Sequence, residues 1–444
     1  MKKQVITLFI VLMALINTSF SQNWTPMAAG LIPNNLVIFS ISAVGENVVW
    51  AVASGEYYQA PIPNSQHPRI LRTSNGGLSW TLQDVEEAPG TISFQIVAVD
   101  SLTAWITTQD YGSGGGRGLY KTTDGGVNWA KTFNNVSGGV ALNRFPDNTH
   151  WLAQNRDAIG RSANNGDNWT GSTFPGYQTD EYQLLHSGAN MSTAVGDTLW
   201  NGTSAGRVVR FTNYGQSAEF FNTGLGTLTA INSIAFHDHL NGLLWSRNLA
   251  NNNRIARSTN GGANWTVLTK QPGSAIGWSI AAVPGAPGFY VLASNYNHDL
   301  GAVAITTNSG DSWTVENLNK PLNAVSFSSP ATGWIGAGRI TSTTQPALFK
   351  YTGSPLVGNK EQNPELPGFS VSPNPAGELI RFDFEGYAEA KTVVVALTDA
   401  QGQRVLLAEN IRTGVVDVSR FPAGLYFLTV QTEKGAAAQK VFVY

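Results

Sequence analysis

The sequence repeats one nine-residue pattern that combines an Asn or Asp, a Gly and a Trp at fixed spacing. Its clearest copy, R-S-T-N-G-G-A-N-W, occupies residues 257–265, and further copies occupy residues 72–80, 121–129, 161–169 and 305–313. An Asn or Asp oxygen at the fourth position can accept hydrogen bonds from backbone amides two residues further on. Gly at the sixth position can adopt positive φ, and the Trp returns a large apolar surface to the sheet. Each copy therefore predicts a tight turn between two β-strands.

The residues expected to build these turns hold the same three positions in every copy. They are Asn75, Gly77, Trp80, Asp124, Gly126, Trp129, Asn164, Gly166, Trp169, Asn260, Gly262, Trp265, Asn308, Gly310 and Trp313. A worn sixth copy at residues 210–220 keeps Asn213 and Gly215 but lacks the Trp.

A second marker, an aromatic residue inside an apolar run, recurs midway between the turns. It occurs seven times, as Trp50, Trp105, Trp151, Trp200, Trp245, Tyr290 and Trp334. Both markers repeat at intervals of about 40 to 55 residues, which is typical of propeller blades made of four short strands. The sequence therefore predicts an all-β fold whose main part is a seven-bladed β-propeller, with the inner strand of each blade first and the aromatic strand second.

The last repeat ends near Thr352 without a Trp. A segment with the missing sequence occurs near the start of the chain. Asn23-Trp24-Thr25 matches Asn264-Trp265-Thr266. We expect this N-terminal strand to complete the seventh blade, because a closed ring leaves no unpaired strand edge.

The turn pattern S/T-x-D/N-x-G-x-x-W resembles the Asp-box of bacterial neuraminidase (BNR) repeats. The pairing of an apolar strand containing Trp with a T-x-D-G-G-x-x-W turn is most similar to propellers of the photosystem II assembly-factor and sortilin type. The resemblance covers residues 23–352 and implies the propeller fold. It implies no particular activity, since unrelated proteins share the turn.

The composition excludes several classes of function. The formal net charge is −2, and no basic face of the kind that binds nucleic acid is evident. There is no cysteine, which rules out disulfides, thiolate zinc sites and cysteine nucleophiles. We expect no cofactor and no metal.

Residues 1–21 have the organisation of a secretory signal peptide. Lys2 and Lys3 precede an apolar run that ends near Ile16, and small and polar residues follow up to Ser21. Such a run is too short to span a bilayer, so we expect cleavage after Ser21 and no transmembrane segment.

The C-terminal part lacks the repeated pattern and differs from the repeats in composition. Residues 354–367 read as a Pro-rich linker between a propeller at residues 22–353 and a second domain at residues 368–444. The landmarks S-V-S-P-N-P-A, D-A-Q-G-Q-R-V, F-P-A-G-L-Y and the terminal K-V-F-V-Y closely resemble the type A C-terminal sorting domain of the type IX secretion system. The resemblance implies a small β-sandwich, a Bacteroidota-like origin and the type IX translocon as partner. It also implies secretion or display on the outer-membrane cell surface, with frequent removal of the domain after export.

The loops expected at the end of the propeller opposite the repeated turns vary most, and irregular loops on a rigid scaffold usually carry binding. Tyrosine offers a flat ring with a hydrogen-bonding tip, which suits contact with a sugar or a protein. We therefore expect a secreted or cell-surface binding protein with a glycan or protein ligand, and the candidate binding residues are Tyr57, Tyr58, Tyr111, Arg117, Tyr177, Tyr296 and His298.

A secreted glycoside hydrolase is the first alternative. The Arg-Ile-Pro motif of sialidases is absent. The basic residues that could serve as a sialidase's arginine cluster occupy one position shared by six repeats, so they are better explained as part of the scaffold. A xyloglucanase-like enzyme needs two facing carboxylates. The candidates are Asp110, Asp180, Glu181 and Asp299, among which the sequence selects no pair, so no catalytic residue is assigned.

Three weaker signals remain open. An extracytoplasmic assembly factor is the second alternative function. His237-Asp238-His239 has two imidazoles that suit a metal, but its position favours a polar turn. Ser101 and Thr198 lie in Asp-Ser/Thr-apolar triplets that resemble a bacterial O-glycosylation acceptor, and they also fit ordinary turns.

Overall fold

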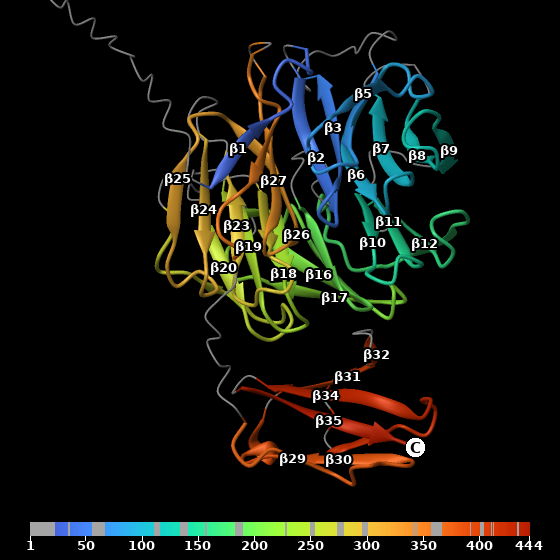
Figure 1. Ribbon diagram of the computed structural model, residues 1–444, viewed down its shortest axis with the longest axis vertical. Helices are drawn as coiled ribbons and strands as arrows, with labels where there is room; N and C mark the ends of the chain where they lie inside the picture. Colours follow the sequence, from blue (N-terminus) through green and yellow to red (C-terminus); the bar gives the residue numbers. More distant parts are fainter. Residues whose placement is uncertain are drawn as a thin grey trace, which may run out of the picture.

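The computed structural model shows a nearly all-β protein with two parts (Figure 1). It describes residues 23–33, 36–55, 67–110, 116–133, 141–155, 158–182, 190–226, 229–248, 254–272, 279–294, 301–340, 342, 344–356, 366–390, 392–399, 404–409, 411, 413–432 and 435–444. The expected signal peptide lies outside these residues. In the described part of the chain no helix is long and apolar enough to cross a membrane.

Within the described residues, strands β1 to β28 form seven four-stranded antiparallel sheets, which we call blades 1 to 7. Blades 1 to 3 consist of β2 (Leu36–Val44), β3 (Val48–Gly55), β4 (Arg69–Thr73) and β5 (Thr81–Asp84); β6 (Thr91–Ala98), β7 (Ala104–Asp110), β8 (Gly118–Thr122) and β9 (Ala130–Phe133); and β10 (Ala141–Arg144), β11 (Trp151–Asn155), β12 (Ala158–Ser162) and β13 (Thr170–Thr173).

Blades 4 to 6 follow the same order. They consist of β14 (Ser192–Val195), β15 (Thr198–Gly202), β16 (Arg207–Thr212) and β17 (Ser217–Asn222); β18 (Thr229–Phe236), β19 (Gly242–Asn248), β20 (Arg254–Ser258) and β21 (Thr266–Val267); and β22 (Ser279–Ala282), β23 (Tyr290–Ala293), β24 (Ala302–Thr306) and β25 (Thr314–Asn317). The seven aromatic markers all lie in second strands and are at most 2 % exposed, as expected for residues that pack between blades.

Blade 7 is built from both ends of the propeller sequence. Strands β26 (Leu322–Ser329), β27 (Thr332–Ala337) and β28 (Leu348–Tyr351) pair in order, and β1 (Trp24–Met27) adds the outer strand antiparallel to β28. Trp24 is 2 % exposed and packs edge-on against Tyr351 at 5.2 Å between ring centroids. The expected ring closure is confirmed.

Antiparallel pairing assigns the connections to two ends of the propeller. Hairpins between first and second strands and the repeated turns between third and fourth strands share one end, which we call the turn face. Loops between second and third strands and the connections between blades share the other end, the loop face.

The repeated turns use a hydrogen-bond pattern that differs from the sequence expectation. The Asn75 Oδ1 atom accepts from the amide of Ser79, four residues on, at 3.0 Å. The amide two residues on, that of Gly77, donates instead to Thr73 Oγ1 at 3.0 Å. Asn75 is thus an acceptor as expected, but the expected donor was wrong, because positive φ at Gly76 and Gly77 turns the amide of Gly77 back toward the hydroxyl. The four other complete copies repeat both bonds.

The turn glycine and the second-strand aromatic residue, two separate markers in the sequence, touch each other across blade boundaries. A Cβ atom at Gly77 would lie 2.9 Å from Trp334 of the preceding blade in the ring. At Gly166 it would lie 3.0 Å from Trp105. Because these separations are too short for a side chain, glycine is required here by packing as well as by φ.

Blade 2 alone among the five complete turns uses Asp at the fourth position, and we expect this turn to respond to pH. Side-chain and backbone hydrogen bonds from Asn128, with one from Thr122, lower the pKa of Asp124 from 3.8 to about 2. The ionised form thus stabilises the fold above about pH 4, and this contribution is lost as the pH falls through the folded pKa. Asp124→Asn, which keeps the Oδ1 acceptor, should match the parent protein at neutral pH and lose less of its melting temperature in acid. Equal acid sensitivity of the two proteins, measured by thermal melts across that pH range, would contradict the assignment.

The basic residue at the first position of the repeat joins six of the seven blades to the next one around the ring. Lys350 donates to the carbonyl of Gly76 at 2.8 Å, and Arg210 donates to that of Gly261 at 3.1 Å. Arg72, Lys121, Arg161 and Arg257 make corresponding contacts to Ser101, Asp167, Gly215 and Asp311. These contacts give the shared basic residue a place in the scaffold.

The C-terminal domain is a sandwich of two sheets, with one buried cluster that contains residues from both. The sheets are β29-β30-β33 and β32-β31-β34-β35, and their strands are β29 (Ser370–Ser372), β30 (Leu379–Asp383), β31 (Val393–Asp399), β32 (Arg404–Glu409), β33 (Val415–Asp417), β34 (Gly424–Thr432) and β35 (Ala436–Val443). A short 3-10 turn, η2 (Tyr387–Glu389), interrupts them. Leu366, expected in the linker, is 4 % exposed and belongs to this cluster because the chain is already packed on the sandwich there.

Candidate functional site

The candidate binding residues are only partly visible in the structure. Tyr57, Tyr58, Tyr111, Tyr296 and His298 lie outside the described residues. Arg117 directly precedes β8 and Tyr177 lies between β13 and β14, so both belong to the loop face. Arg117 belongs to blade 2 and Tyr177 to the connection between blades 3 and 4, and their role as a joint site stays a prediction.

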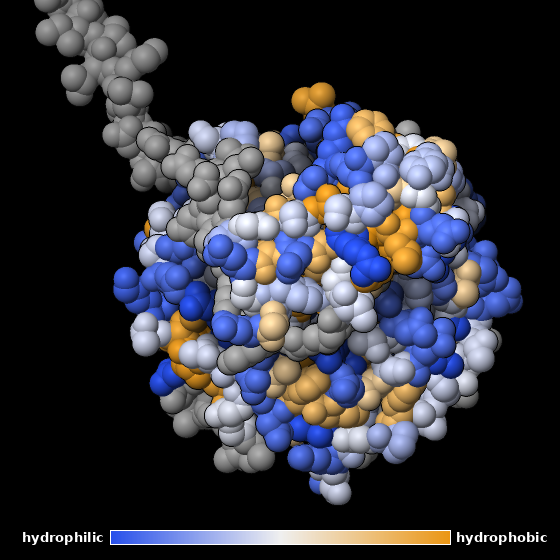
Figure 2. Space-filling view, turned by 90° about the horizontal axis from the view of Figure 1, so that it is seen from below, coloured by the Kyte–Doolittle hydropathy of each residue, from blue (hydrophilic) through white to orange (hydrophobic). Residues whose placement is uncertain are grey.

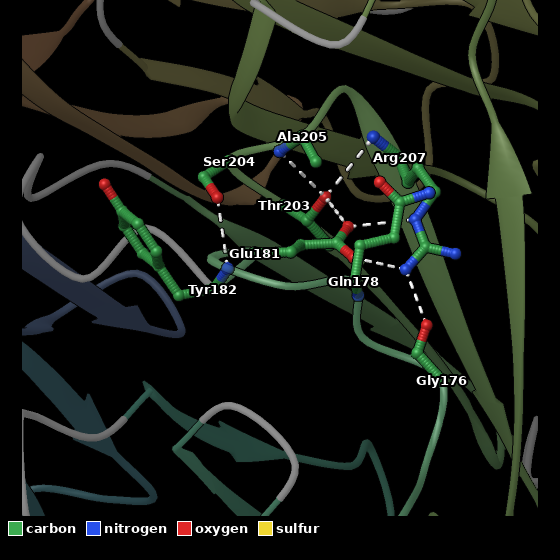
Figure 3. A network of polar contacts seen from close by, with 8 residues as sticks. All are labelled: Gly176, Gln178, Glu181, Tyr182, Thr203, Ser204, Ala205 and Arg207. Atoms are coloured by element: carbon green, nitrogen blue, oxygen red, sulfur yellow. Dashed lines mark hydrogen bonds and ion pairs between the residues drawn. The ribbon is translucent and has the colours of Figure 1, made fainter.

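A buried ion pair holds the Tyr177 segment on the loop face of blade 4 (Figure 3). The Glu181 carboxylate accepts from Arg207 Nε at 3.0 Å, from Thr203 Oγ1 at 2.5 Å and from the backbone amide of Gln178 at 2.8 Å, and Arg207 Nη2 makes a further ion pair. The Glu181 side chain is fully buried and that of Arg207 is 12 % exposed. We call these four residues the Glu181 clamp.

The clamp keeps Glu181 ionised. Burial raises the pKa of its carboxyl, but the hydrogen bonds from Arg207, Gln178 and Thr203 outweigh burial, so the pKa lies below its ordinary value. A carboxylate with no free acceptor site and a lowered pKa is suited to fixing a segment rather than to donating a proton.

The clamp orients two tyrosines. The Arg207 guanidinium lies over the Phe220 ring at 4.5 Å, and Tyr177 packs edge-on against the same ring at 4.9 Å. Tyr182, directly after Glu181, is tied to Ser204 by hydrogen bonds of 3.0 and 2.8 Å through its backbone, yet 48 % of its surface is exposed. The sequence analysis named Tyr177 and missed Tyr182, although both lie in one irregular loop and Tyr182 is the more accessible.

The structure places Asp238, Thr198 and Ser101, which belong to the weaker candidate sites, in or beside turns between strands. Asp238 Oδ1 accepts from the amides of Leu240 and Asn241 at 2.7 and 2.6 Å, which is the expected polar turn between β18 and β19. Thr198 is 2 % exposed and its hydroxyl lies 3.0 Å from Asp197 Oδ1, whereas Ser101 is half-buried. A glycan on Thr198 would have to displace this packing. Asp299 and the side chain of Asp110 lie outside the described residues.

A cavity of about 1020 Å³ lies at the turn-face mouth of the central channel. Its lining combines apolar residues at the ends of the inner strands, such as Val195 and Phe327, with a rim that carries Asp147, Asp197 and His237. The cavity is at the opposite end of the propeller from the loop face.

Asn190 bridges the channel at the inner end of this cavity. Its side-chain amide donates to the carbonyls of Ile280 in blade 6 and Val325 in blade 7, both at 3.0 Å. Its own carbonyl accepts from Ser233 Oγ of blade 5 at 2.9 Å. Asn190, which lies just before blade 4, is thus hydrogen-bonded to blades 5, 6 and 7. These contacts close the inner end of the cavity.

The fold defines the protein class as a β-propeller followed by a β-sandwich. Residues 370–444 match the family model of the secretion system C-terminal sorting domain, Por_Secre_tail. The protein is therefore an exported propeller protein with a type IX sorting domain, which implies secretion or cell-surface export.

Solved structures resemble the propeller part. YCF48 bound to D1 peptide is 16% identical with a TM-score of 0.52, covering 75% of this chain and 97% of that chain. U3-55K is 12% identical with a TM-score of 0.54, covering 75% and 99%. The GH74 enzyme of Niastella koreensis is 13% identical with a TM-score of 0.42, covering 90% and 84%. Among curated proteins no sequence matches the chain. At these identities the likeness shows the fold alone.

Proposed function

We propose that the protein is a secreted or cell-surface binding protein that captures a glycan or protein ligand with the loop face of its propeller. A signal peptide at residues 1–21 and the sorting domain would together take it across both membranes. The rigid ring supplies the scaffold, and the variable loops supply the contacts.

The Glu181 clamp is the observation that carries this proposal. Burying an ion pair costs roughly several kcal/mol of desolvation unless further hydrogen bonds offset it. Here the offsetting hydrogen bonds from Thr203 and Gln178 also hold the surface segment that carries Glu181. The segment presents the exposed ring of Tyr182 on a backbone that is already fixed, with Tyr177 packed on Phe220 beside it. A pre-ordered aromatic residue loses little conformational entropy on binding, which favours recognition.

A protein ligand has support from the solved YCF48 structure, which contains a D1 peptide on a propeller of similar fold. The glycoside hydrolase alternative is weaker, because Glu181, one of its four candidate carboxylates, is occupied by Arg207 and Thr203. An assembly factor would also bind protein and would differ from a cell-surface receptor in its partner.

Tyr182→Ala should weaken ligand capture about 10- to 30-fold, the usual effect of removing an aromatic hot spot, while the melting temperature stays nearly unchanged. Binding partners would first be sought on glycan and peptide arrays with the purified protein, and affinities of the hits would then be titrated. Leu78→Ala is the matched control, since Leu78 is 89 % exposed in a repeated turn on the turn face. Loss of binding by Leu78→Ala with full binding by Tyr182→Ala would place the ligand on the turn face.

A further inference from the structure

The turn-face cavity has residues of the sorting domain in its wall. Thr398, Val405 and Leu406, at the hairpin end where β31 leads into β32, line it together with the ends of the inner strands of the propeller. In Figure 1 the sandwich lies beneath the propeller with β32 nearest to the blades, which agrees with this lining.

A hydrogen bond joins the two domains beside the cavity. Gln431 Nε2 on β34 donates to Asp238 Oδ2 in the β18–β19 turn at 3.1 Å, and His237 Nδ1 lies 3.1 Å from the same oxygen. Burial raises the pKa of Asp238, but hydrogen bonds and the charge of His237 and hydrogen bonds from Asn241 hold it well below its ordinary value. The propeller therefore presents an ionised acceptor to a neutral donor of the sorting domain.

The outer face of the sheet β32-β31-β34-β35 is covered only in part. Val394, which pairs with Gln431, is 6 % exposed although its neighbours Val393 and Val395 are the ones in the sandwich core. On the same face of the sheet, Phe427, which pairs with Thr398, and Phe442 of the edge strand β35 stay 42 % and 46 % exposed. Seen from below, the surface is a mixture of small apolar patches and polar residues (Figure 2). The covered part of this face therefore lies around Val394 and Gln431, beside the hydrogen bond to Asp238.

We propose that the turn-face mouth is a docking surface for the chain's own sorting domain, whose β31–β32 hairpin end covers one side of the channel cavity. The cavity then becomes more accessible when the sorting domain leaves the propeller. This proposal concerns the opposite end of the propeller from the loop face and is independent of ligand capture there.

The absence of cysteine from the chain makes the docked geometry directly testable by cross-linking. His237→Cys with Gln431→Cys should react with a short bis-maleimide about tenfold faster than Leu78→Cys with Gln431→Cys, because docking raises the effective concentration of one pair only. Leu78 is the control, since it lies on the same turn face but in blade 1. Equal rates for the two pairs would mean that the domain moves freely on its linker and would overturn the proposal. Ala282→Cys with Val405→Cys, two residues that line the cavity, replaces the first pair if that variant does not fold.

Charge at position 431 gives a second test on the full chain. Gln431→Glu places a carboxylate against Asp238 and should expose the cavity, whereas Gln431→Lys should hold it shut. A single cysteine at Ala282 reports access, and its maleimide labelling rate should rise several-fold, about 3- to 10-fold, from the Lys to the Glu variant, as expected for a screened contact between charges. Rates that are identical in the Gln, Glu and Lys forms would contradict docking.

Discussion

Replacing Trp24 by alanine is expected to lower the free energy of unfolding by about 3–5 kcal/mol, the range for removing a buried Trp. Trp24 is 2 % exposed and packs against Phe327 and Tyr351, so its loss leaves a cavity at the closure of the ring. The same change weakens the only strand by which the N-terminal segment of the described chain pairs with blade 7. Denaturant unfolding of the purified protein measures the effect.

Thr25→Ala is the matched control for this strand. Thr25 is exposed, and its hydroxyl lies 2.9 Å from that of Thr352. A surface change of this kind should alter the free energy of unfolding by no more than about 0.5 kcal/mol. Similar losses in the two variants would show that strand pairing alone, and not the buried Trp, secures the ring.

Glu181→Ala should destabilise the protein by about 3–5 kcal/mol, because it leaves the Arg207 guanidinium buried without its counter-charge. Arg207 would keep Gly176 as a hydrogen-bond partner and Phe220 beneath its guanidinium, and neither carries a compensating charge. Because the clamp holds Tyr182 in place, the variant should also bind ligand more weakly. Denaturant unfolding at neutral pH gives the first quantity.

The double variant Glu181→Met with Arg207→Met separates charge burial from loss of shape. It should be much more stable than Glu181→Ala, since replacing both charges of a buried pair by apolar groups is often neutral. The pH dependence adds an independent check. The lowered pKa of Glu181 means that the clamp stabilises the fold above the unfolded-state value of about 4.3 and fails as the pH falls through the folded pKa. The double variant should lack this acid-sensitive step, and its persistence would assign it to another carboxyl group.

Local patterns in the sequence were sufficient to predict the turns, the strand order and the ring closure. A turn such as Thr73 to Trp80 depends on a few adjacent residues whose conformational preferences act over one hydrogen-bonded loop. The sequence match between the segments around Trp24 and Trp265 also predicted an outer strand from local residues, because every blade needs the same outer strand. The sorting domain was recognisable because its turns and terminal strand also have local signatures.

The tertiary structure was needed for contacts between distant residues. Nothing near Gly77 in the sequence indicates that Trp334 packs on it. Asn75 is the expected acceptor, but its donor is the amide of Ser79 rather than that of Gly77, because the φ values of the glycines decide where each amide points. Glu181 lies in the connection between blades 3 and 4, and its partner Arg207 lies in the third strand of blade 4. This pair does not recur in the other repeats, so no periodic pattern in the sequence indicated it. Tyr182 was missed for the same reason.

The sequence by itself thus determined the class of fold and the export route, since both depend on short motifs whose geometry is set within a few residues. Only the tertiary structure decided which residues meet at the Glu181 clamp, how Asn190 spans four blades, and which end of the channel holds the cavity. The physical reason is that these features depend on how blades are packed around the axis. A side chain's partner there is set by the position of other blades, which no local pattern of residues encodes.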